Sequence, residues 1–144
     1  FIHQAVAECM LNILQFHGDE TPEQCRGFPV MTMKAFRMRG PETLEQLPEY
    51  GTDGFLLDAY VKDALGGTGE TFNWGLAVRA AEFGKPIFLA GGLTPDNVAD
   101  AVQQVRPFGV DVSSGVESAP GKKDADAVWS LVAAVRAAER LPDA

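Results

Sequence analysis

The stretch Ile87-Phe88-Leu89-Ala90-Gly91-Gly92-Leu93-Thr94-Pro95 decides the fold class, because it joins an apolar run to two glycines and a helix start. The apolar residues at its beginning are typical of a buried strand. Thr94 suits the N-cap of a helix and Pro95 suits its first turn. Apolar residues then recur with a period of 3.6 over residues 98–105, which places them on one helix face. The stretch therefore predicts a strand, a tight glycine turn and a helix.

The same alternation of strand and helix signals runs along the whole chain. Further apolar runs predict strands at 13–16, 30–36, 55–57 and 109–112. Helical periodicity recurs at 2–9, 74–81 and 128–135, and shorter helices are expected from Thr21 and over 41–46, the latter ended by Pro48. Asp124 is expected to cap the last helix. Because strands joined through single helices pair in parallel, residues 1–144 are expected to form one α/β domain.

The composition excludes several classes of function. The 144 residues are 46% hydrophobic and 22% charged, as in one globular domain. The 20 acidic and 12 basic residues give a formal net charge of −8, which disfavours nucleic acid and anionic membranes as partners. No apolar run approaches the roughly 20 residues of a membrane span. Because Cys9 and Cys25 are the only cysteines, neither a disulfide framework nor a thiolate zinc site is expected. This use of cysteine is typical of a reducing compartment, so a cytoplasmic location is expected.

Polar residues and glycines follow the predicted strands, at the ends where parallel α/β proteins carry their sites. They include His17, Asp58, Gly91-Gly92 and Ser114-Gly115. Gly66-Gly67-Thr68-Gly69 lies far beyond its strand and does not follow the dinucleotide pattern G-x-G-x-x-G. Backbone amides at the two late glycine turns favour a phosphate site instead. The alternative is that these glycines only permit a positive φ in tight turns.

Several ordered motifs resemble the phosphoribosylanthranilate isomerase family of tryptophan biosynthesis. They are LQFHGDE at 14–20, FLLD at 55–58, GGTGETFNW at 66–74, LAGGLTPDNV at 89–98, VDVSSGVE at 110–117 and PGKKD at 120–124. The resemblance spans essentially the whole chain. It implies a (β/α)8 TIM barrel of about 200 residues, in which this chain is similar to strands four to eight with their helices. The chain then begins within the third helix and lacks the first three β/α units.

The resemblance also implies a reaction, the Amadori rearrangement of N-(5-phosphoribosyl)anthranilate to 1-(2-carboxyphenylamino)-1-deoxyribulose 5-phosphate. An acid must protonate the ring oxygen and a base must remove the proton from C2, and neither step needs a metal or a cofactor. Asp58 is the implied acid, although the pattern alone suits a cap or turn residue equally well. Neither Cys9 nor Cys25 matches the general-base cysteine that the family carries on its first strand, and the family's substrate-binding arginine follows the second strand. The 144 residues alone are therefore expected to be inactive.

The resemblance assigns further residues to the small phosphosugar substrate. They are His17, Gly67, Gly69, Gly91, Gly92, Asp111, Ser114 and Gly115. Gly67 and Gly69 would belong to a loop that closes over substrate, and a plain surface loop is the alternative. Asp111 points opposite to its two valine neighbours and would hold substrate, with a structural salt bridge as the alternative.

Four other polar positions allow a functional or a structural interpretation. His17 would line the site or cap a turn. Lys34 interrupts an apolar strand and is expected to be a barrel-interior cation paired with a carboxylate. Lys122 and Lys123 are expected to be solvated charges before a helix.

Functions of other kinds stay open at this point. The chain could be a phosphosugar-binding module without catalysis. Alternatively, its open sheet edges could pair with a second copy or with a complementing fragment. Indole-glycerol-phosphate synthase, another phosphate-binding barrel, would be expected to carry a catalytic lysine and glutamate on early strands, and the glycine motifs fit the isomerase better.

Overall fold

Five parallel strands form one sheet in the structure, a computed structural model that describes residues 1–59 and 74–140. The strands follow the chain order β1 (Ile13–Phe16), β2 (Met31–Met38), β3 (Gly54–Ala59), β4 (Ile87–Ala90) and β5 (Gly109–Asp111). Every neighbouring pair is parallel. The predicted parallel α/β sheet is therefore confirmed, and two strands extend beyond their predicted ends. The predicted loop residues Gly67 and Gly69 lie outside the described residues.

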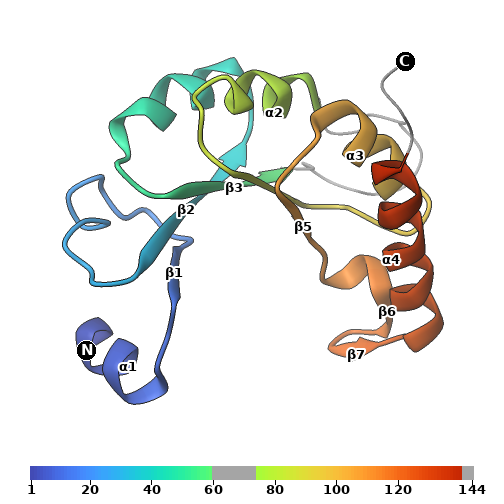
Figure 1. The fold of residues 1–144 in the computed structure, drawn as a ribbon, viewed down its shortest axis with the longest axis horizontal. Helices are drawn as coiled ribbons and strands as arrows, with labels where there is room; N and C mark the ends of the chain where they lie inside the picture. The colour runs from blue at the N-terminus through green and yellow to red at the C-terminus, as the bar shows by residue number, and fades with distance from the viewer. Residues whose placement is uncertain (60–73, 141–144) are drawn as a thin grey trace.

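Helices cover one face of this sheet. The helical elements are α1 (Ile2–Cys9), η1 (Pro41–Glu49), α2 (Trp74–Ala81), α3 (Val98–Val105), η2 (Ser114–Val116) and α4 (Ala125–Glu139), and a hairpin of β6 (Glu117–Ala119) and β7 (Lys122–Lys123) precedes α4. Figure 1 shows the sheet as an arch with η1, α2 and α3 on its convex side. Consecutive parallel strands with their crossovers on one face form the wall of a TIM-barrel-like fold.

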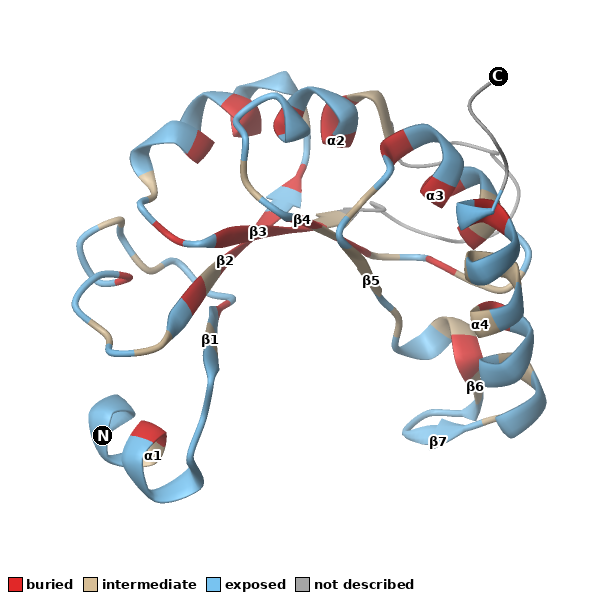
Figure 2. Cartoon of the chain, viewed as in Figure 1, coloured by how far each residue is buried: buried red, intermediate tan, exposed pale blue. Residues whose placement is uncertain are grey.

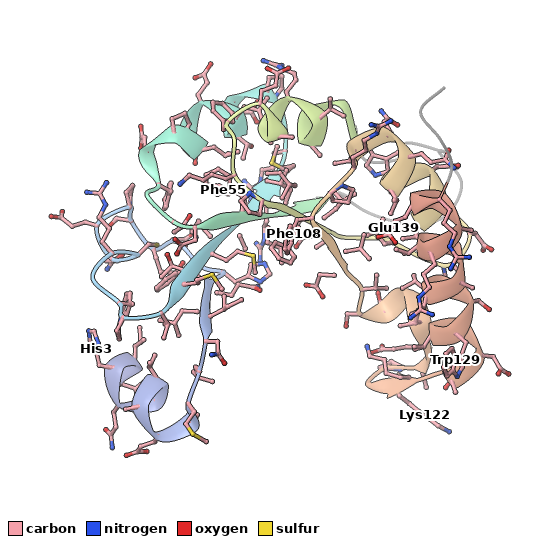
Figure 3. The ribbon with its side chains drawn as sticks, viewed as in Figure 1. His3, Phe55, Phe108, Lys122, Trp129 and Glu139 are labelled. Atoms are coloured by element: carbon pink, nitrogen blue, oxygen red, sulfur yellow. The ribbon has the colours of Figure 1, made fainter. Side chains whose placement is uncertain are left out.

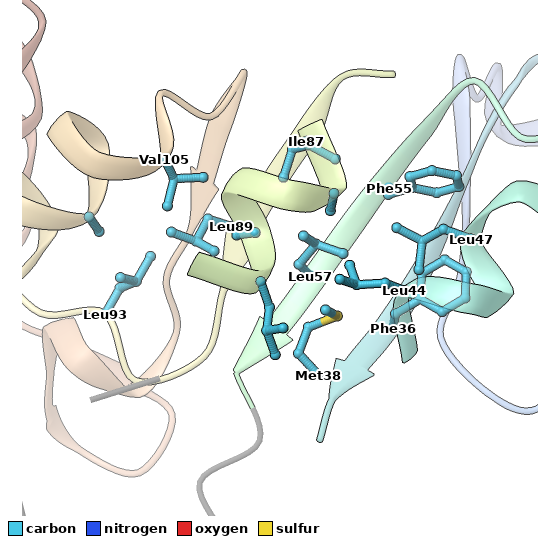
Figure 4. Packing of buried hydrophobic residues seen from close by; sticks show 14 residues of the cluster. Phe36, Met38, Leu44, Leu47, Phe55, Leu57, Ile87, Leu89, Leu93 and Val105 are labelled. Carbon is cyan, nitrogen blue, oxygen red and sulfur yellow. The ribbon is translucent and has the colours of Figure 1, made fainter. Parts of the chain in front are cut away.

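Alternation along the strands separates a helix-facing layer from the concave face. Phe55 and Leu57 of β3 pack with residues of η1, α2 and α3 in the main core cluster, shown in Figure 4. Leu56, between them, belongs to a small cluster with Ala35 and Ala90 on the opposite face. Figure 2 shows the buried positions concentrated between sheet and helices. Leu57 is fully buried, and burying such a side chain stabilises the fold by about 1.5–3 kcal/mol.

The helix predicted from Thr21 is wrong, because residues 22–25 form only turns. The capping hydrogen bonds do form: the Thr21 amide donates to Gln24 Oε1 at 2.8 Å, and the Gln24 amide donates to Thr21 Oγ1 at 3.4 Å. Gly27 then takes a φ of +80° shortly before Pro29, so the segment has too few residues to continue as a helix. Cys25 accordingly lies in a turn and is buried there.

Two other predicted helix limits differ from the structure. Residues 41–49 form a 3-10 helix that contains Pro48 instead of ending before it. The helix α3 begins at Val98 with Asn97 as its N-cap, because Thr94 starts a turn that precedes the helix. Asp124 caps α4 as predicted, accepting a hydrogen bond from the Ala127 amide at 2.9 Å.

Lys34 lies on the helix-facing side of β2, and the prediction of a barrel-interior cation is wrong. It shares the face of Phe36, whose ring it overlies at 5.9 Å, and it is buried. The predicted carboxylate partner does exist, since Lys34 Nζ lies 3.0 Å from Glu20 Oε2. The period of two along β2 explains the correction, because Ala35 occupies the concave face and its neighbours face the opposite way.

Candidate active site

A cavity of about 210 Å³ opens at the carboxyl ends of β3, β4 and β5. The predicted site residues that line it are His17, Asp58, Gly91, Gly92, Asp111, Ser114 and Gly115. Residues that lie up to 98 positions apart in the sequence, such as His17 and Gly115, are brought together because parallel strands present all their carboxyl ends at one edge. The structure thus groups every predicted site residue within the described ranges, whereas the chemical role of each stays a prediction.

Asp58 stands on β3 next to the last residue of the strand. Its side chain is on the same face as Leu56 and is 30% exposed. Asp58 Oδ2 lies 3.8 Å from His17 Nε2, and no other side chain of residues 1–59 and 74–140 is within ion-pair distance of this carboxylate. A half-buried carboxyl group that lines a cavity, with no permanent cationic partner among the described residues, is suited to exchanging a proton with a bound molecule.

His17 follows β1 directly and is 47% exposed. Its Nδ1 atom lies 3.3 Å from Gln15 Nε2. The other ring nitrogen, Nε2, is the one nearest to Asp58. The histidine therefore lies beside the carboxylate at the cavity, with Gln15 on the far side of its ring.

The turn after β4 needs both of its glycines. Gly91 has a φ of +85° and Gly92 a φ of +65°, which residues with side chains rarely adopt. The turn is held by Asn97, whose Nδ2 donates to the Gly92 carbonyl at 3.0 Å and whose Oδ1 accepts from the Thr94 amide at 2.8 Å. The positive φ expected of the glycine turn is therefore observed at Gly91 and Gly92. It is compatible with anion binding, since the same turn faces the cavity.

Gly115 is required for a different reason, the close approach of the two loops. A Cβ atom at this position would lie 1.8 Å from the carbonyl oxygen of Leu93. The loop after β5 therefore packs directly on the loop after β4. Residues of both loops line the cavity, and a phosphate site built from backbone amides requires two such loops close together.

Asp111 is the last residue of β5 and lines the same cavity. It is exposed, and no basic side chain of the described residues lies within ion-pair distance of it. The structural salt bridge considered as an alternative is therefore not formed within the described part of the chain. Its register partner on β4 is Ala90, whose small side chain leaves the carboxylate facing open space.

A buried clamp holds the loop that carries His17. Lys34 Nζ donates to the Gly18 carbonyl at 2.6 Å and to Glu20 Oε2 at 3.0 Å, and Tyr50 donates its hydroxyl to the Glu20 carbonyl at 3.0 Å. Partial burial alone would raise the pKa of Glu20, but hydrogen bonds from Lys34 and from backbone amides lower it overall. Burial raises the pKa values of Cys25 and Tyr50 nearby. These hydrogen bonds of Lys34, Glu20 and Tyr50 form the clamp, a structural element that lies on the helix-facing side of the sheet.

Arg37 is a site-associated residue that the sequence reasoning missed, and Lys123, expected to be a solvated charge, instead hydrogen-bonds the Ser113 carbonyl in the loop after β5. Arg37 pairs in register with Asp58 on the concave side of the sheet and lines a second cavity of about 630 Å³, which also includes His17. A signal for Arg37 exists in the sequence, because Met33, Ala35 and Arg37 alternate with the residues that face the helices. Lys123 reaches the loop after β5 through a hairpin that periodicity does not predict.

Neither a metal centre nor a membrane span is found in the described ranges. No group of three or more His, Cys, Asp or Glu side chains there is arranged to hold a metal ion. Among the helices of residues 1–59 and 74–140, none has the length and apolar character needed to cross a bilayer.

Comparisons with known proteins agree with this arrangement. The model of the family described as N-(5'phosphoribosyl)anthranilate (PRA) isomerase matches residues 1–134. The N-(5'-phosphoribosyl)anthranilate isomerase of Trichlorobacter lovleyi is 53% identical over 131 residues, which cover 91% of this chain and 64% of that protein. A structure of monomers generated from the dimeric enzyme of Thermotoga maritima is 34% identical with a TM-score of 0.80, covering 94% of this chain and 66% of that one.

A further solved structure contains a bound ligand. It is a phosphoribosyl anthranilate isomerase in complex with reduced 1-(o-carboxyphenylamino)-1-deoxyribulose 5-phosphate, 33% identical to this chain with a TM-score of 0.76. The match covers 93% of this chain and 64% of that one. The chain thus spans slightly less than two thirds of the length of these three proteins. Because the family model matches almost all of its residues, the chain belongs to the N-(5'-phosphoribosyl)anthranilate isomerase family.

Proposed function

We propose that this chain provides the acid and the phosphate-binding part of an isomerase that acts on N-(5-phosphoribosyl)anthranilate in tryptophan biosynthesis. The observation that carries the proposal is the cavity itself, which is lined by Asp58 and by the two glycine loops that follow β4 and β5. An acid and an anion site on one rim fit a substrate that has a ring oxygen to protonate and a phosphate to hold. The ligand bound by the related enzyme belongs to the same chemical class.

Asp58 is the proposed general acid. It gives its proton to the furanose ring oxygen as the bond between that oxygen and C1 breaks, and the anilino nitrogen lends its lone pair to C1. A base then removes the proton from C2, the electron pair forms the C1–C2 double bond, and the C1–N π electrons return to the anilino nitrogen. The enol hydroxyl group at C2 loses its proton and C1 gains one, which gives the ketone. His17 and Asp111 would hydrogen-bond the sugar hydroxyl groups, since both line the cavity. The substrate itself supplies and accepts the electrons of the bond cleavage and the double-bond shift, so the mechanism uses no redox cofactor.

The phosphate is proposed to bind backbone N–H groups of Gly92, Ser114 and Gly115. Such donors do not depend on the net charge of −8, which would otherwise repel an anionic substrate. Gly67 and Gly69 are retained as the loop proposed to close over the substrate, although they lie outside the described residues.

The finer proposal is that residues 1–144 correspond to strands four to eight of the barrel. Cys9 is exposed near the end of α1 and Cys25 is buried behind the rim, so neither suits the role of the family's general base. The 144 residues by themselves are then expected to bind phosphate without turning over substrate.

A chimaera tests both parts of this proposal. Residues 1–144 replace the matching segment of the Trichlorobacter lovleyi relative, and turnover is followed by the loss of substrate fluorescence. We expect the chimaera to be active and the 144-residue chain alone to be at least about a thousandfold slower, since the base is absent from it. Turnover by the chain alone within tenfold of the chimaera would contradict the missing base, and an inactive but folded chimaera would contradict the proposed function.

Association through the sheet edges is the second candidate role. Within the described residues, β1 and β5 have a partner on one side only, and Ile13, Met31 and Phe108 near these edges are exposed. Such edges favour pairing with a second copy or with a complementing fragment. Light scattering that gives the mass of one 144-residue chain at micromolar concentration would contradict this role.

Two further proposals have their own tests. Residues 1–144 are proposed to form a single domain, for which a single cooperative urea transition is expected. The proposed cytoplasmic location is tested by fractionation of the source cells.

A further inference from the structure

The hairpin of β6 and β7 places one lysine of a neighbouring pair against the loop after β5. Lys123 Nζ donates to the Ser113 carbonyl at 2.9 Å and lies 3.4 Å from Ser113 Oγ. It also donates to Glu117 Oε1 at 2.7 Å. Lys122 makes no side-chain hydrogen bond or ion pair with any residue that the structure describes, and Figure 3 shows it extending away from the hairpin. The two adjacent lysines therefore have different structural roles.

The carbonyl that Lys123 holds belongs to a peptide unit of the cavity wall. The Ser113 carbonyl and the Ser114 N–H are parts of one planar, trans peptide, so they point in opposite directions. Ser113 and Ser114 both line the cavity, whereas Lys123 does not. Fixing the carbonyl on the side of Lys123 therefore turns the Ser114 N–H away from Lys123, which is not among the residues that line the cavity.

The short 3-10 helix η2 holds this peptide through one long hydrogen bond. Ser113 follows the last strand and precedes η2, with a φ of −113° and a ψ of −88°, which belong to neither a helix nor a strand. The Val116 amide donates to the same Ser113 carbonyl, but at a distance of 3.4 Å. The lysine contact is shorter and charge-assisted, so it is the stronger of the two.

Glu117 keeps the ammonium group of Lys123 in place. Its side chain is 14% exposed, and its second oxygen accepts from the Gly121 amide at 3.2 Å across the hairpin. Hydrogen bonds from Lys123 and then from Gly121 hold the pKa of Glu117 below its usual value, so the pair is ionised at neutral pH. Because Glu117 already neutralises it, Lys123 need not reach the phosphate to act.

We propose that Lys123 is a positioning residue that orients the Ser113–Ser114 peptide so that the Ser114 N–H group, next to that of Gly115, binds the phosphate. This inference rests on the proposed function, since it assumes that the cavity takes a phosphate. Charge from the ammonium group also polarises the peptide and strengthens its N–H as a donor. Lys122 and Lys123 are alike in the sequence, and only the hairpin separates them.

The test compares Lys123→Met with its neighbour Lys122→Met in the 144-residue chain. Inorganic phosphate is titrated while the amide resonances of Ser114 and Gly115 are followed by ¹H–¹⁵N NMR. We expect Lys123→Met to weaken phosphate binding by about tenfold, as for the loss of an oriented donor, and to shift both amide resonances before phosphate is added. Lys122→Met also removes one positive charge from β7, but Lys122 pairs with Ala119 and not with Glu117. This variant is expected to change the phosphate affinity by less than about twofold.

Two further variants separate positioning from a general effect on folding. Lys123→Arg keeps a charged donor and is expected to restore the affinity to within about threefold of the wild type. In the active chimaera, Lys123→Met is expected to raise KM by about tenfold with kcat changed less than threefold, whereas partial unfolding would lower the apparent kcat without changing KM. Should Lys123→Met fail to fold, Lys123→Gln takes its place with the same expectation.

The outcomes are distinguishable. Wild-type chain that binds no phosphate at millimolar concentration would contradict the proposed phosphate site itself. Wild-type binding with equal affinity in folded Lys123→Met or Lys123→Gln would overturn the positioning role and leave the proposed function standing. Equal losses in the Lys122 and Lys123 variants would also overturn it, because only net charge would then matter.

Discussion

The loops after β4 and β5 differ from the strand ends of β1 and β3 in how firmly the structure holds their functional groups. In the first pair, Asn97 ties the glycine turn from both ends, and Gly115 packs its backbone against Leu93. In the second pair, His17 and Asp58 are partly exposed side chains 3.8 Å apart. Groups that bind an unreacting phosphate can be fixed in advance. Groups that transfer a proton commonly adopt their short contacts only when substrate is bound.

The substitution Asp58→Asn tests the second pair most directly. The amide cannot donate a proton as an acid, so we expect kcat of the active chimaera to fall by about 10²–10⁴-fold. Phosphate affinity of the 144-residue chain is expected to stay within twofold of the wild type, because the anion loops are unaffected. Steady-state kinetics and a phosphate titration give the two readouts. If Asp58→Asn lowered phosphate affinity as well as kcat, the strand ends of β1 and β3 would not act independently of the loops after β4 and β5.

Gly115→Ala is the corresponding test of the fixed loops. The added Cβ atom would lie 1.8 Å from the Leu93 carbonyl oxygen, so one of the two loops has to move. We expect the free energy of unfolding to fall by about 2–3 kcal/mol, as for overpacking of a rigid contact, and phosphate binding to be lost in the folded fraction. Urea titration measures the first effect. An alanine tolerated without any loss of stability would mean that the loops are not in contact.

Gly92→Ala is the matched control for that substitution. The position has open space around a Cβ atom, and its φ of +65° is the only obstacle. A left-handed conformation costs a residue with a side chain about 1–2 kcal/mol, so the loss of stability should be smaller than at Gly115. The same urea experiment ranks the two. If Gly92→Ala destabilises the chain more than Gly115→Ala, the close approach of the loops is not the dominant constraint.

The sheet and the site are predictable from the sequence to different depths. Four-residue apolar runs such as Ile87–Ala90 locate strands well, because three of the four side chains in this run are buried in the folded chain. The shared edge of parallel strand ends is enough to group Asp58 with Gly91 and Gly115 from the sequence alone. The Thr21 helix is absent because capping residues specify a start and not a length. A lysine within an apolar strand suggests a cation in the barrel interior, whereas the period of the strand decides which face the side chain is on, so the predicted face of Lys34 is wrong.

Contacts between distant segments were beyond sequence reasoning. Three contacts join residues that no local periodicity relates. They are the close approach of Gly115 to Leu93, the hydrogen bond from Lys123 to the Ser113 carbonyl and the hydrogen bond from Lys34 to the Gly18 carbonyl. Adjacent lysines look identical in a sequence. Their difference arises only when the hairpin turns one of them toward the loop after β5.

The clamp behind His17 predicts the smallest effect, a dependence of stability on pH. Glu20 has a pKa below its ordinary value of 4.5 in the folded chain, so its contribution is present above that value and is lost as the pH falls through the lowered pKa. In Lys34→Met the hydrogen bond that lowers this pKa is removed. We therefore expect the free energy of unfolding of the wild type to fall more steeply than that of Lys34→Met below about pH 4.5.

The difference should be less than about 1 kcal/mol, because the Glu20 carboxylate keeps partial access to water. Urea titrations of both proteins at a series of acidic pH values measure it. If the free energies of unfolding of the two proteins fell equally with pH, the hydrogen bonds of Lys34 would not stabilise the loop that carries His17. The difference between the two pairs of strand ends would then include the backbone as well as the side chains, because only the loops after β4 and β5 would have a firmly held backbone.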